Sequence, residues 1–186
     1  YHPEGLNLNS TAILDGVTIY GGSASDLLGG GGMVNLGSSP TIRNTIFTGN
    51  LAAGMAGGML NAGSSPVLVN VTFDGNKAAT GGGMVNGASS PTITDCTFTN
   101  NIATEGGGMR NESNSTPVLT NCAFTGNTAD FGGGMYNYDS FPTLDTCTFT
   151  SNTAEYGGGL FILGGSSYLN NVTFSANTAG ISGGGI

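Results

Sequence analysis

Apolar residues recur along the chain in short alternating runs, which are separated by polar turns or glycine-rich bends. The stretch Gly81–Asn101, GGGMVNGASSPTITDCTFTNN, displays this arrangement most clearly. Alternation with a period of two is typical of a strand that buries one face. In this stretch it predicts three short strands, at Met84–Asn86, Thr92–Thr94 and Cys96–Thr99. It directs Met84, Asn86, Ile93, Cys96 and Phe98 inward, and Val85 and the threonines outward.

The same stretch repeats along the whole chain at intervals of 25 or 26 residues. The methionine of the GGGM motif has a counterpart in each copy, at Met33, Met59, Met84, Met109, Met135, Leu160 and Ile186. The phenylalanine recurs at Phe47, Phe73, Phe98, Phe124, Phe149 and Phe174, always three residues before an asparagine. One copy cannot bury its apolar face alone, so the copies must stack on one another. The repeat therefore predicts a solenoid.

Stacked coils with three short strands each define an all-β fold, the parallel β-helix. Like residues then lie on like at the strand spacing of about 4.8 Å, and about seven coils of 25–26 residues make a rod roughly 34 Å long. We predict one domain over residues 1–186, with an atypical first coil in 1–32, regular coils in 33–159 and a divergent, uncapped last coil in 160–186. Asp95 and its counterparts are expected in the left-handed conformation at the corner between the second and third strands.

The GGGM and FTGN motifs resemble the paired GGA[ILV] and FxxN repeats of the chlamydial polymorphic outer-membrane proteins. More broadly, they are similar to the right-handed parallel β-helix repeats of bacterial surface proteins. The resemblance covers the chain from Gly29 onward, with a third glycine where that family often has alanine. It implies a right-handed β-helix located outside the cell or on its surface. The implied function is an extracellular structural or adhesive rod, with a glycan or a host surface as its partner.

Composition and charge narrow the classes of partner. Glycine contributes 35 of the 186 residues, but there is no G-X-Y period and 38% of the residues are hydrophobic, which argues against collagen and against disorder. Three basic residues and a net charge of −8 cannot provide a basic patch, so nucleic acid and anionic membrane surfaces are not expected partners. No apolar run approaches the length of about 18 residues that a spanning helix needs, so membrane insertion is not expected either.

The outward threonines beside the phenylalanine column form a second candidate surface. Nine of the fourteen flanking positions are threonine, and seven of them make up the most regular part of the array: Thr72, Thr97, Thr99, Thr125, Thr148, Thr150 and Thr173. Regular Thr-x-Thr ladders resemble the flat faces of ice-binding solenoids, so an antifreeze function is an alternative. Threonine is also simply a good outward strand residue, and the array is interrupted by Tyr20, Ile46, Asp74 and Ala123.

A polysaccharide-binding or polysaccharide-degrading β-helix is a second alternative. Asp130 and Glu155 align two residues before the GGG motifs of successive coils. Two stacked carboxylates could bind Ca²⁺ or act as an acid/base pair. Solvated loop acids are the commoner case, so these two residues are only weak candidates for a metal or catalytic site. The expectation is a protein that is not an enzyme and has no cofactor.

Two inward columns carry polar atoms or thiols. Asparagines stacked in register, such as Asn86 and Asn101 with their counterparts, can chain their amides and satisfy buried turn carbonyls. The cysteines Cys96, Cys122 and Cys147 lie two residues before their phenylalanines, at a position that other copies fill with valine or threonine. They are therefore read as three buried thiols. Both columns are interpreted as structural.

The last residues suggest a way to self-associate. The sequence ends on Gly183, Gly184, Gly185 and Ile186, with Ile186 at the methionine position and no polar cap after it. Solenoids normally cover their terminal coils. The expected partner is therefore either further repeats of a longer chain or a second copy. Head-to-tail docking of copies would build a filament.

Overall fold

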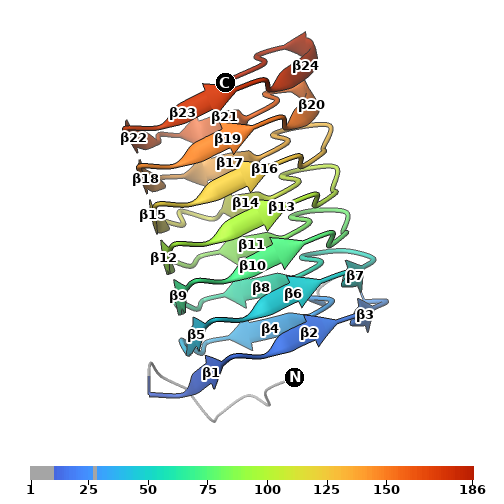
Figure 1. Ribbon diagram of the computed structural model, residues 1–186, viewed down its shortest axis with the longest axis vertical. Coiled ribbons are helices and arrows are strands. Elements are labelled where there is room, and N and C mark those ends of the chain that lie inside the picture. The colour runs from blue at the N-terminus through green and yellow to red at the C-terminus, as the bar shows by residue number, and fades with distance from the viewer. Residues whose placement is uncertain (1–10, 27–28) are drawn as a thin grey trace.

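The chain winds into a parallel β-solenoid of about seven turns, as the strand arrows of Figure 1 show. The structure is a computed structural model that describes residues 11–26 and 29–186. In that part of the chain 24 strands are present, and every strand pairing is parallel. From Met33 onward, each coil contributes one strand to each of three sheets, so the prediction of an all-β fold with three short strands per coil is confirmed.

Sheet I holds the strands that begin at the methionine position: β4 (Met33–Leu36), β8 (Met59–Ala62), β11 (Met84–Gly87), β14 (Met109–Glu112), β17 (Met135–Ser140) and β21 (Leu160–Gly165). Sheet II follows it in each coil: β1 (Ile13–Asp15), β5 (Thr41–Arg43), β9 (Val67–Val69), β12 (Thr92–Thr94), β15 (Val118–Thr120), β18 (Thr143–Asp145) and β22 (Tyr168–Asn170). Sheet III contains the phenylalanines: β2 (Thr18–Tyr20), β6 (Ile46–Thr48), β10 (Thr72–Asp74), β13 (Thr97–Thr99), β16 (Ala123–Thr125), β19 (Thr148–Thr150) and β23 (Thr173–Ser175).

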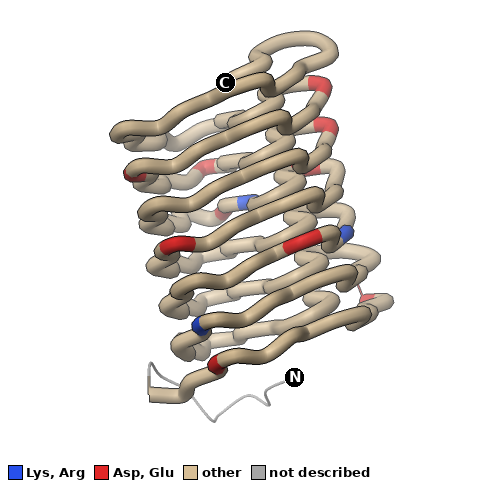
Figure 2. The backbone as a smooth tube through the Cα atoms, in the orientation of Figure 1, with Lys and Arg blue, Asp and Glu red and all other residues tan. Residues whose placement is uncertain are grey.

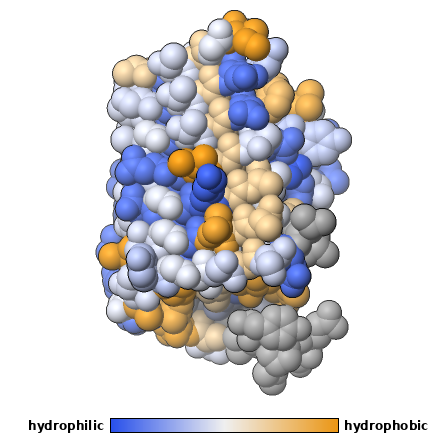
Figure 3. All heavy atoms as spheres, turned by 90° about the vertical axis from the view of Figure 1, so that its right-hand side faces the viewer, coloured by the Kyte–Doolittle hydropathy of each residue, from blue (hydrophilic) through white to orange (hydrophobic). Residues whose placement is uncertain are grey.

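The loops that return from sheet III to sheet I also pair from coil to coil, which the sequence pattern did not predict. Short strands form at the two ends of this row, β3 (Ser23–Ala24) with β7 (Leu51–Ala52) and β20 (Thr153–Tyr156) with β24 (Thr178–Ser182). Between them, single-residue bridges such as Lys77 to Ile102 continue the row. The expected glycine-rich bends are therefore a fourth hydrogen-bonded segment. Figure 3 views the side of the molecule that carries these loops and finds its hydrophobic residues in several separate groups.

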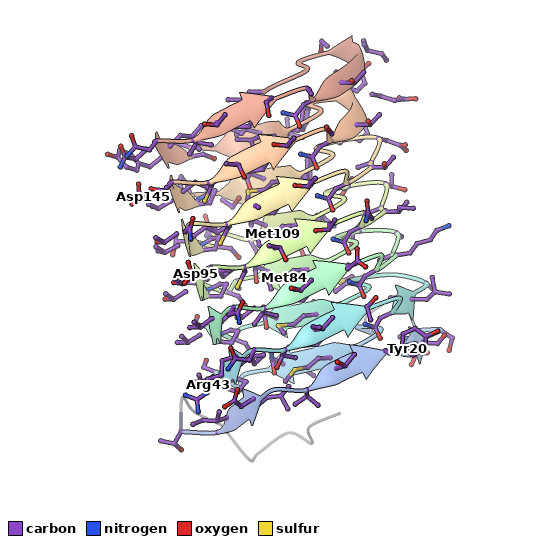
Figure 4. All side chains as sticks on the ribbon, viewed as in Figure 1. Tyr20, Arg43, Met84, Asp95, Met109 and Asp145 are labelled. Atoms are coloured by element: carbon purple, nitrogen blue, oxygen red, sulfur yellow. The ribbon has the colours of Figure 1, made fainter. Side chains whose placement is uncertain are left out.

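The core consists of columns of identical or similar side chains, as the alternation predicted. Phe47, Phe73, Phe98, Phe124, Phe149 and Phe174 stack with ring centroids 4.6–4.9 Å apart and interplanar angles of 14° or less. Met84, Ile93 and Phe98 have no exposed surface, and Figure 4 places Met84 and Met109 between the sheets. Stacking in register buries each ring against the ring of the next coil, so the coils depend on one another for their core.

The corner between sheets II and III adopts the predicted left-handed conformation. Asp95 has φ 54°, and its counterparts Asn44, Asn70, Asn121, Thr146 and Asn171 have φ between 49° and 55°. Asn121 donates a hydrogen bond to Asp95 over 2.6 Å, so the corner residues also link neighbouring coils. Asp95 and Asp145 mark this edge of the solenoid in Figure 4. The predicted strand Cys96–Thr99 begins one residue later, at Thr97, because Cys96 belongs to the corner.

Two asparagine ladders run through the interior. Their side-chain amides pair with one another or with backbone groups, so burial does not leave these polar atoms unpaired. Asn101 accepts hydrogen bonds from the backbone N–H and the Nδ2 of Asn76, both over 3.0 Å. It donates from its own Nδ2 to the carbonyl of Phe73 over 2.9 Å and to Oδ1 of Asn127 over 3.1 Å. The second ladder joins Asn35, Asn61, Asn86, Asn111 and Asn137, with each Nδ2 donating to the Oδ1 of the next coil. The structural interpretation of both columns is confirmed.

The GGG motif is required by the close approach of successive coils. A Cβ atom added to Gly83 would lie 2.5 Å from the carbonyl oxygen of Gly108 and 3.1 Å from the ring of Phe98. No side chain fits between those two groups without moving the backbone of the next coil. The glycines thus let the return loop lie directly against the phenylalanine column.

Val85 differs from its expected outward, solvated position. Its side chain does point away from the main core, but it has no exposed surface. It packs with Leu60 and Ala56 in a second, smaller apolar cluster. The cause is the return loop, which folds back over the outer face of sheet I until a Cβ atom on Gly81 would collide with Val85. The alternation gives the direction of a side chain but not what covers it.

Candidate functional site

The outer face of sheet I changes character along the rod. Two outward columns run along it: Val34, Leu60, Val85, Arg110, Tyr136 and Phe161 in the first, and Leu36, Ala62, Gly87, Glu112, Tyr138 and Leu163 in the second. The early coils contribute aliphatic residues or glycine, the middle coil an arginine and a glutamate, and the last two coils mostly aromatic residues. We call the surface formed by Tyr136, Tyr138, Phe161 and Leu163, with the flanking loop residues Phe131 and Tyr156, the aromatic face.

Rings of the aromatic face stack from coil to coil. Tyr136 and Phe161 are stacked with centroids 5.6 Å apart and planes 8° apart. Phe131 and Tyr156 form a second stack, at 5.3 Å and 6°. The two stacks meet where Phe131 tilts against Phe161, at 5.6 Å and 55°. Such contacts fix the ring positions, so this surface is ordered before any ligand arrives.

Part of the aromatic face is open to solvent. Tyr136 is buried, with 5% of its surface exposed, whereas Tyr138 is 42% and Leu163 is 51% exposed. Phe141, just beyond the end of β17, is 44% exposed. Large apolar side chains gathered on one exposed surface mark interaction sites more often than single exposed residues do. The geometry therefore offers a firm, partly apolar platform at β17 and β21.

Arg110 connects this platform to a charged neighbour. Its guanidinium lies 2.8 Å from Glu112 and 3.3 Å from Glu105, and its Cζ is 5.8 Å from the ring centroid of Tyr136. The Nε of Arg110 is buried without a hydrogen-bond partner. Burial, together with the negative charge of Glu105, raises the pKa of Tyr136, which therefore remains a neutral phenol. Arg110, Glu105 and Glu112 thus place charged, hydrogen-bonding groups beside the stacked rings.

The threonine array lies on a different side of the solenoid, in sheet III. Its members are in register: Thr72 faces Thr97 in the first column, and Thr99 faces Thr125 in the second. Thr148 and Thr173 are exposed and the other five predicted members are half-buried. Thr97 donates a hydrogen bond to Thr72 over 3.1 Å. Ala123 and Asp74 interrupt the two columns, as the sequence indicates.

Asp130 and Glu155 lie one above the other in successive return loops. The backbone N–H of Glu155 donates to the carbonyl of Asp130 over 3.0 Å, and both side chains are exposed. Over residues 11–26 and 29–186, no group of three or more histidine, cysteine, aspartate or glutamate side chains could hold a metal ion. The metal or acid/base role of this pair stays a prediction.

Gly183–Gly185 continue the hydrogen-bonded row of the GGG motifs. Their carbonyls accept from the backbone N–H groups of Gly158, Gly159 and Leu160 over 2.8–3.1 Å. Ile186 is 57% exposed, beside a hollow also lined by Leu160, Phe161 and Ile162. Head-to-tail association through this end stays a prediction.

Charged residues are sparse along the described part of the chain, as Figure 2 shows. The three basic residues lie on three different parts of the coil, with Arg43 on sheet II, Lys77 on a return loop and Arg110 on sheet I. Arg43 is paired with Asp15 over 2.9 Å. In the residues that the structure describes, no helix is long and apolar enough to span a membrane.

The cysteine column is buried, as predicted, and its thiols interact with one another. Cys96, Cys122 and Cys147 are at most 1% exposed and unpaired by disulfides. The Cys122 thiol beside it lowers the pKa of Cys96. The pKa of Cys122 is lowered by its hydrogen bond with Cys147, but the hydrogen bond with Cys96 and burial outweigh that effect and raise it to about 12. A hydrogen bond with Cys122, with burial, raises the pKa of Cys147.

We expect these thiols to resist alkylation in the folded protein, because the reagent cannot reach them and because Cys122 and Cys147 remain protonated at neutral pH. N-ethylmaleimide labelling followed by mass spectrometry should find no rapid modification of the native chain. In guanidinium chloride, all three cysteines should react. Rapid labelling of the native chain at the same sites would contradict the inward placement.

The fold and its side-chain columns define a class: a β-solenoid whose repeat-defining residues are interior and whose outward residues vary from coil to coil. The chain belongs to a family within that class, since the model of the right handed beta helix region matches residues 4–179. No curated protein and no solved structure gives a significant match to the chain. The prediction of a right-handed β-helix is confirmed.

The aromatic face was not found from the sequence. Its signal was present, because the residues one and three positions after each methionine counterpart can be aligned across the copies. Read that way, Tyr136, Phe161, Tyr138 and Leu163 stand apart from Val34 and the other members of the early coils. Alternation within one copy gives the direction of each side chain, but it does not reveal that the outward residues change from aliphatic to aromatic between copies.

Proposed function

We propose that this chain is an extracellular structural and adhesive rod that binds glycan through the aromatic face. The observation that carries the proposal is the group of rings on β17, β21 and the adjoining return loops. Tyr136 stacks on Phe161 and Phe131 on Tyr156, and Tyr138 beside them is exposed. It acts by binding rather than by catalysis. Flat ring faces pack against the apolar faces of sugar rings, and the adjacent Arg110–Glu112 pair supplies polar groups for hydroxyls.

The structural part of the role is supported by where the invariant residues lie. Between Asn35 and Leu160 the members of the methionine, phenylalanine and asparagine columns are buried, whereas the outward positions change from coil to coil. A shaft built this way holds its surface groups at fixed spacings and permits their replacement without loss of the fold. The extracellular location is supported by the resemblance of the GGGM and FTGN motifs to the β-helix repeats of bacterial surface proteins. Labelling of intact source cells by an antibody against the folded chain tests the location.

The binding test compares two double variants that remove outward side chains from different sheets. Tyr138→Ala with Leu163→Ala removes the exposed part of the aromatic face, and Thr97→Ala with Thr99→Ala removes two members of the threonine array. Retention on a panel of insoluble polysaccharides, with and without Ca²⁺, should fall about 10-fold for the first variant because two central contacts are lost. The second variant should bind as the unaltered chain does.

Three results of this assay would contradict the proposal. The unaltered chain fails to bind any polysaccharide of the panel, or the aromatic variant binds as well as the unaltered chain, or the threonine variant is the one that loses retention. Thermal unfolding of both variants, followed by circular dichroism, serves as the control for folding. Release of soluble sugar during the incubation would indicate an enzyme instead, with Asp130 and Glu155 as the first residues to replace.

An ice-binding function is a second candidate, favoured by the register of sheet III. Seven strands align their outward threonines in two columns at the coil rise, and neighbouring Phe rings in the same sheet are 4.6–4.9 Å apart. A regular grid of hydroxyl and methyl groups is what such a function requires. An ice-recrystallisation assay tests it, with Thr99→Tyr as the variant that should abolish activity by disturbing the flat face. Activity that survives this substitution would exclude sheet III as the ice-binding surface.

A further inference from the structure

The three cysteines form a column within the core of the solenoid. They occupy successive coils, and the carbonyl oxygens of Cys96 and Cys122 accept hydrogen bonds from Ala123 and Thr148 of the next coils over 3.0 and 2.9 Å. The phenylalanine rings two residues farther along are 4.6 Å apart in both intervals, Phe98 to Phe124 and Phe124 to Phe149. The thiols of neighbouring coils are thus repeated at the same rise, pointing the same way.

Packing alone does not require sulfur at this position. The corresponding residues of other coils are Val17, Thr45, Val71 and Val172, and Val71 is as buried as the cysteines. Three adjacent coils have cysteine and the flanking ones do not. Neither is the column arranged for a disulfide, because parallel side chains at the strand spacing place their Cβ atoms farther apart than the mean of about 3.8 Å in disulfides.

We propose that two stacked thiols of this column bind one soft, thiophilic divalent cation of the mercury(II) type in a linear sulfur–metal–sulfur unit. A metal–thiolate bond is about 2.3 Å in zinc sites, and a bond of that length on each side of the ion spans about 4.6 Å. That span equals the spacing of the coils beside the cysteines. The described residues contain no cluster of three or more ligands, whereas a linear unit needs only two, and thiolates are selective for soft ions.

The charge of the product suits the core. Two S–H bonds break, and so do the two bonds from the ion to its previous ligands, chloride or glutathione thiolate. Two bonds form from the ion to the protein sulfurs, the protons pass to water or to the released thiolates, and no electron is transferred. A divalent ion with two thiolates is neutral overall, whereas a monovalent ion would leave one negative charge in apolar surroundings, where an unpaired charge is costly. The raised pKa of Cys122 has the same cause in part, because burial disfavours the negative charge of a free thiolate. Zinc is disfavoured because it takes four ligands.

Cys122 belongs to both adjacent pairs, Cys96–Cys122 and Cys122–Cys147, so only its replacement removes both candidate sites. Valine is the natural alternative at this position, so Cys96→Val, Cys122→Val and Cys147→Val are matched substitutions. Cys96→Val and Cys147→Val each leave one adjacent pair. Cys122→Val leaves two thiols that are two coils apart, too far for one ion to join. A general loss of core stability would affect the three variants alike, but loss of the linear site affects only one.

The probe is mercuric chloride, added to the full chain in the presence of glutathione as a competing monothiol. One set of samples is incubated folded to equilibrium, and a second is refolded from guanidinium chloride with the ion, so that burial of the thiols cannot prevent binding. Native mass spectrometry counts bound ions, and X-ray absorption measures the ligands. We expect one ion in the unaltered chain, Cys96→Val and Cys147→Val, with two sulfur neighbours at about 2.3 Å. Retention by Cys122→Val should be about 100-fold weaker, because two sulfurs on one scaffold act as a chelate.

The proposal is overturned if Cys122→Val retains the ion as firmly as the other two variants. It is also overturned if no ion survives glutathione in the refolded, unaltered chain, or if the circular dichroism of the loaded chain shows that the ion unfolds the solenoid.

Discussion

Replacing Phe98 with alanine is expected to lower the free energy of unfolding by about 3–5 kcal/mol, since it removes a ring from the middle of a close-packed column. Phe98 has no exposed surface and stacks at 4.9 Å on Phe73 and 4.6 Å on Phe124. The coil backbone is held on both sides by hydrogen bonds, so it cannot collapse into the space that the ring leaves. Chemical unfolding in guanidinium chloride, followed by circular dichroism, measures the change.

Thr97→Ala is the matched control, because Thr97 immediately precedes Phe98 on the same strand and its side chain points to the opposite face. Its loss should cost under about 1 kcal/mol, the range typical of surface substitutions. Its hydrogen bond to Thr72 is partly exposed, which keeps the effect small. Equal unfolding midpoints for the two variants would show that the inside and outside of sheet III are wrongly assigned.

Asn101→Leu should destabilise the chain by at least about 3 kcal/mol, although leucine has a similar size and is more apolar. The amide of Asn101 takes part in four buried hydrogen bonds, two as acceptor from Asn76 and two as donor to Phe73 and Asn127. The substitution takes the side-chain acceptor from the backbone N–H of Asn76 and the side-chain donor from the carbonyl of Phe73. Nδ2 of Asn76 keeps its bond to the carbonyl of Phe47, and Oδ1 of Asn127 keeps the backbone N–H of residue 101. Each buried group left unpaired costs about 1–3 kcal/mol. The same unfolding measurement provides the value.

Asn100→Gly separates the effect of the ladder from the effect of the turn. Asn100 is exposed and left-handed, with φ 54°, and the matching position in three other coils is a glycine, Gly49, Gly75 or Gly126. Glycine adopts this conformation without strain, so the substitution should change stability by less than about 1 kcal/mol. If Asn101→Leu proved as mild as Asn100→Gly, the asparagine ladder would be incidental to the fold.

The parts of the fold that depend on neighbours in sequence were predictable. Phe98, Ile93 and Asp95 were placed correctly because alternation and turn preference act within a few residues. The residues that pack on Val85 could not be predicted in this way, because they lie partly in the return loop, whose path depends on the closure of the whole coil. Likewise, Ser167 accepts a hydrogen bond from Asn137 over 3.0 Å. It thereby ends the second asparagine ladder where Ile162 replaces asparagine, a substitution of partners that no local pattern reveals.

The candidate site was less predictable than the fold for the same reason. Tyr138 and Leu163 are 25 residues apart in sequence and become neighbours only through coil stacking. Their surface is defined by a difference between coils, whereas the repeat is recognised by what the coils share. The pairing of Arg110 with Glu105 and Glu112 also required the structure, because Glu105 reaches it from the return loop.

The asparagine ladders restrict which insertions and deletions in the gene the fold can accept. Each bond between two asparagine side chains in them joins residues 25 or 26 positions apart, so beyond this one-residue difference they tolerate a change of length only in whole coils. Excision of residues 84–108 would set Met109 on Met59, Asn111 on Asn61 and Phe124 on Phe73, with like still facing like. Unequal recombination between the repeats of such a gene can therefore add or remove about 4.8 Å of reach per event. A deletion of several residues that is not close to a whole coil would misalign both ladders at once, so the lengths of such genes should differ in steps of about one repeat.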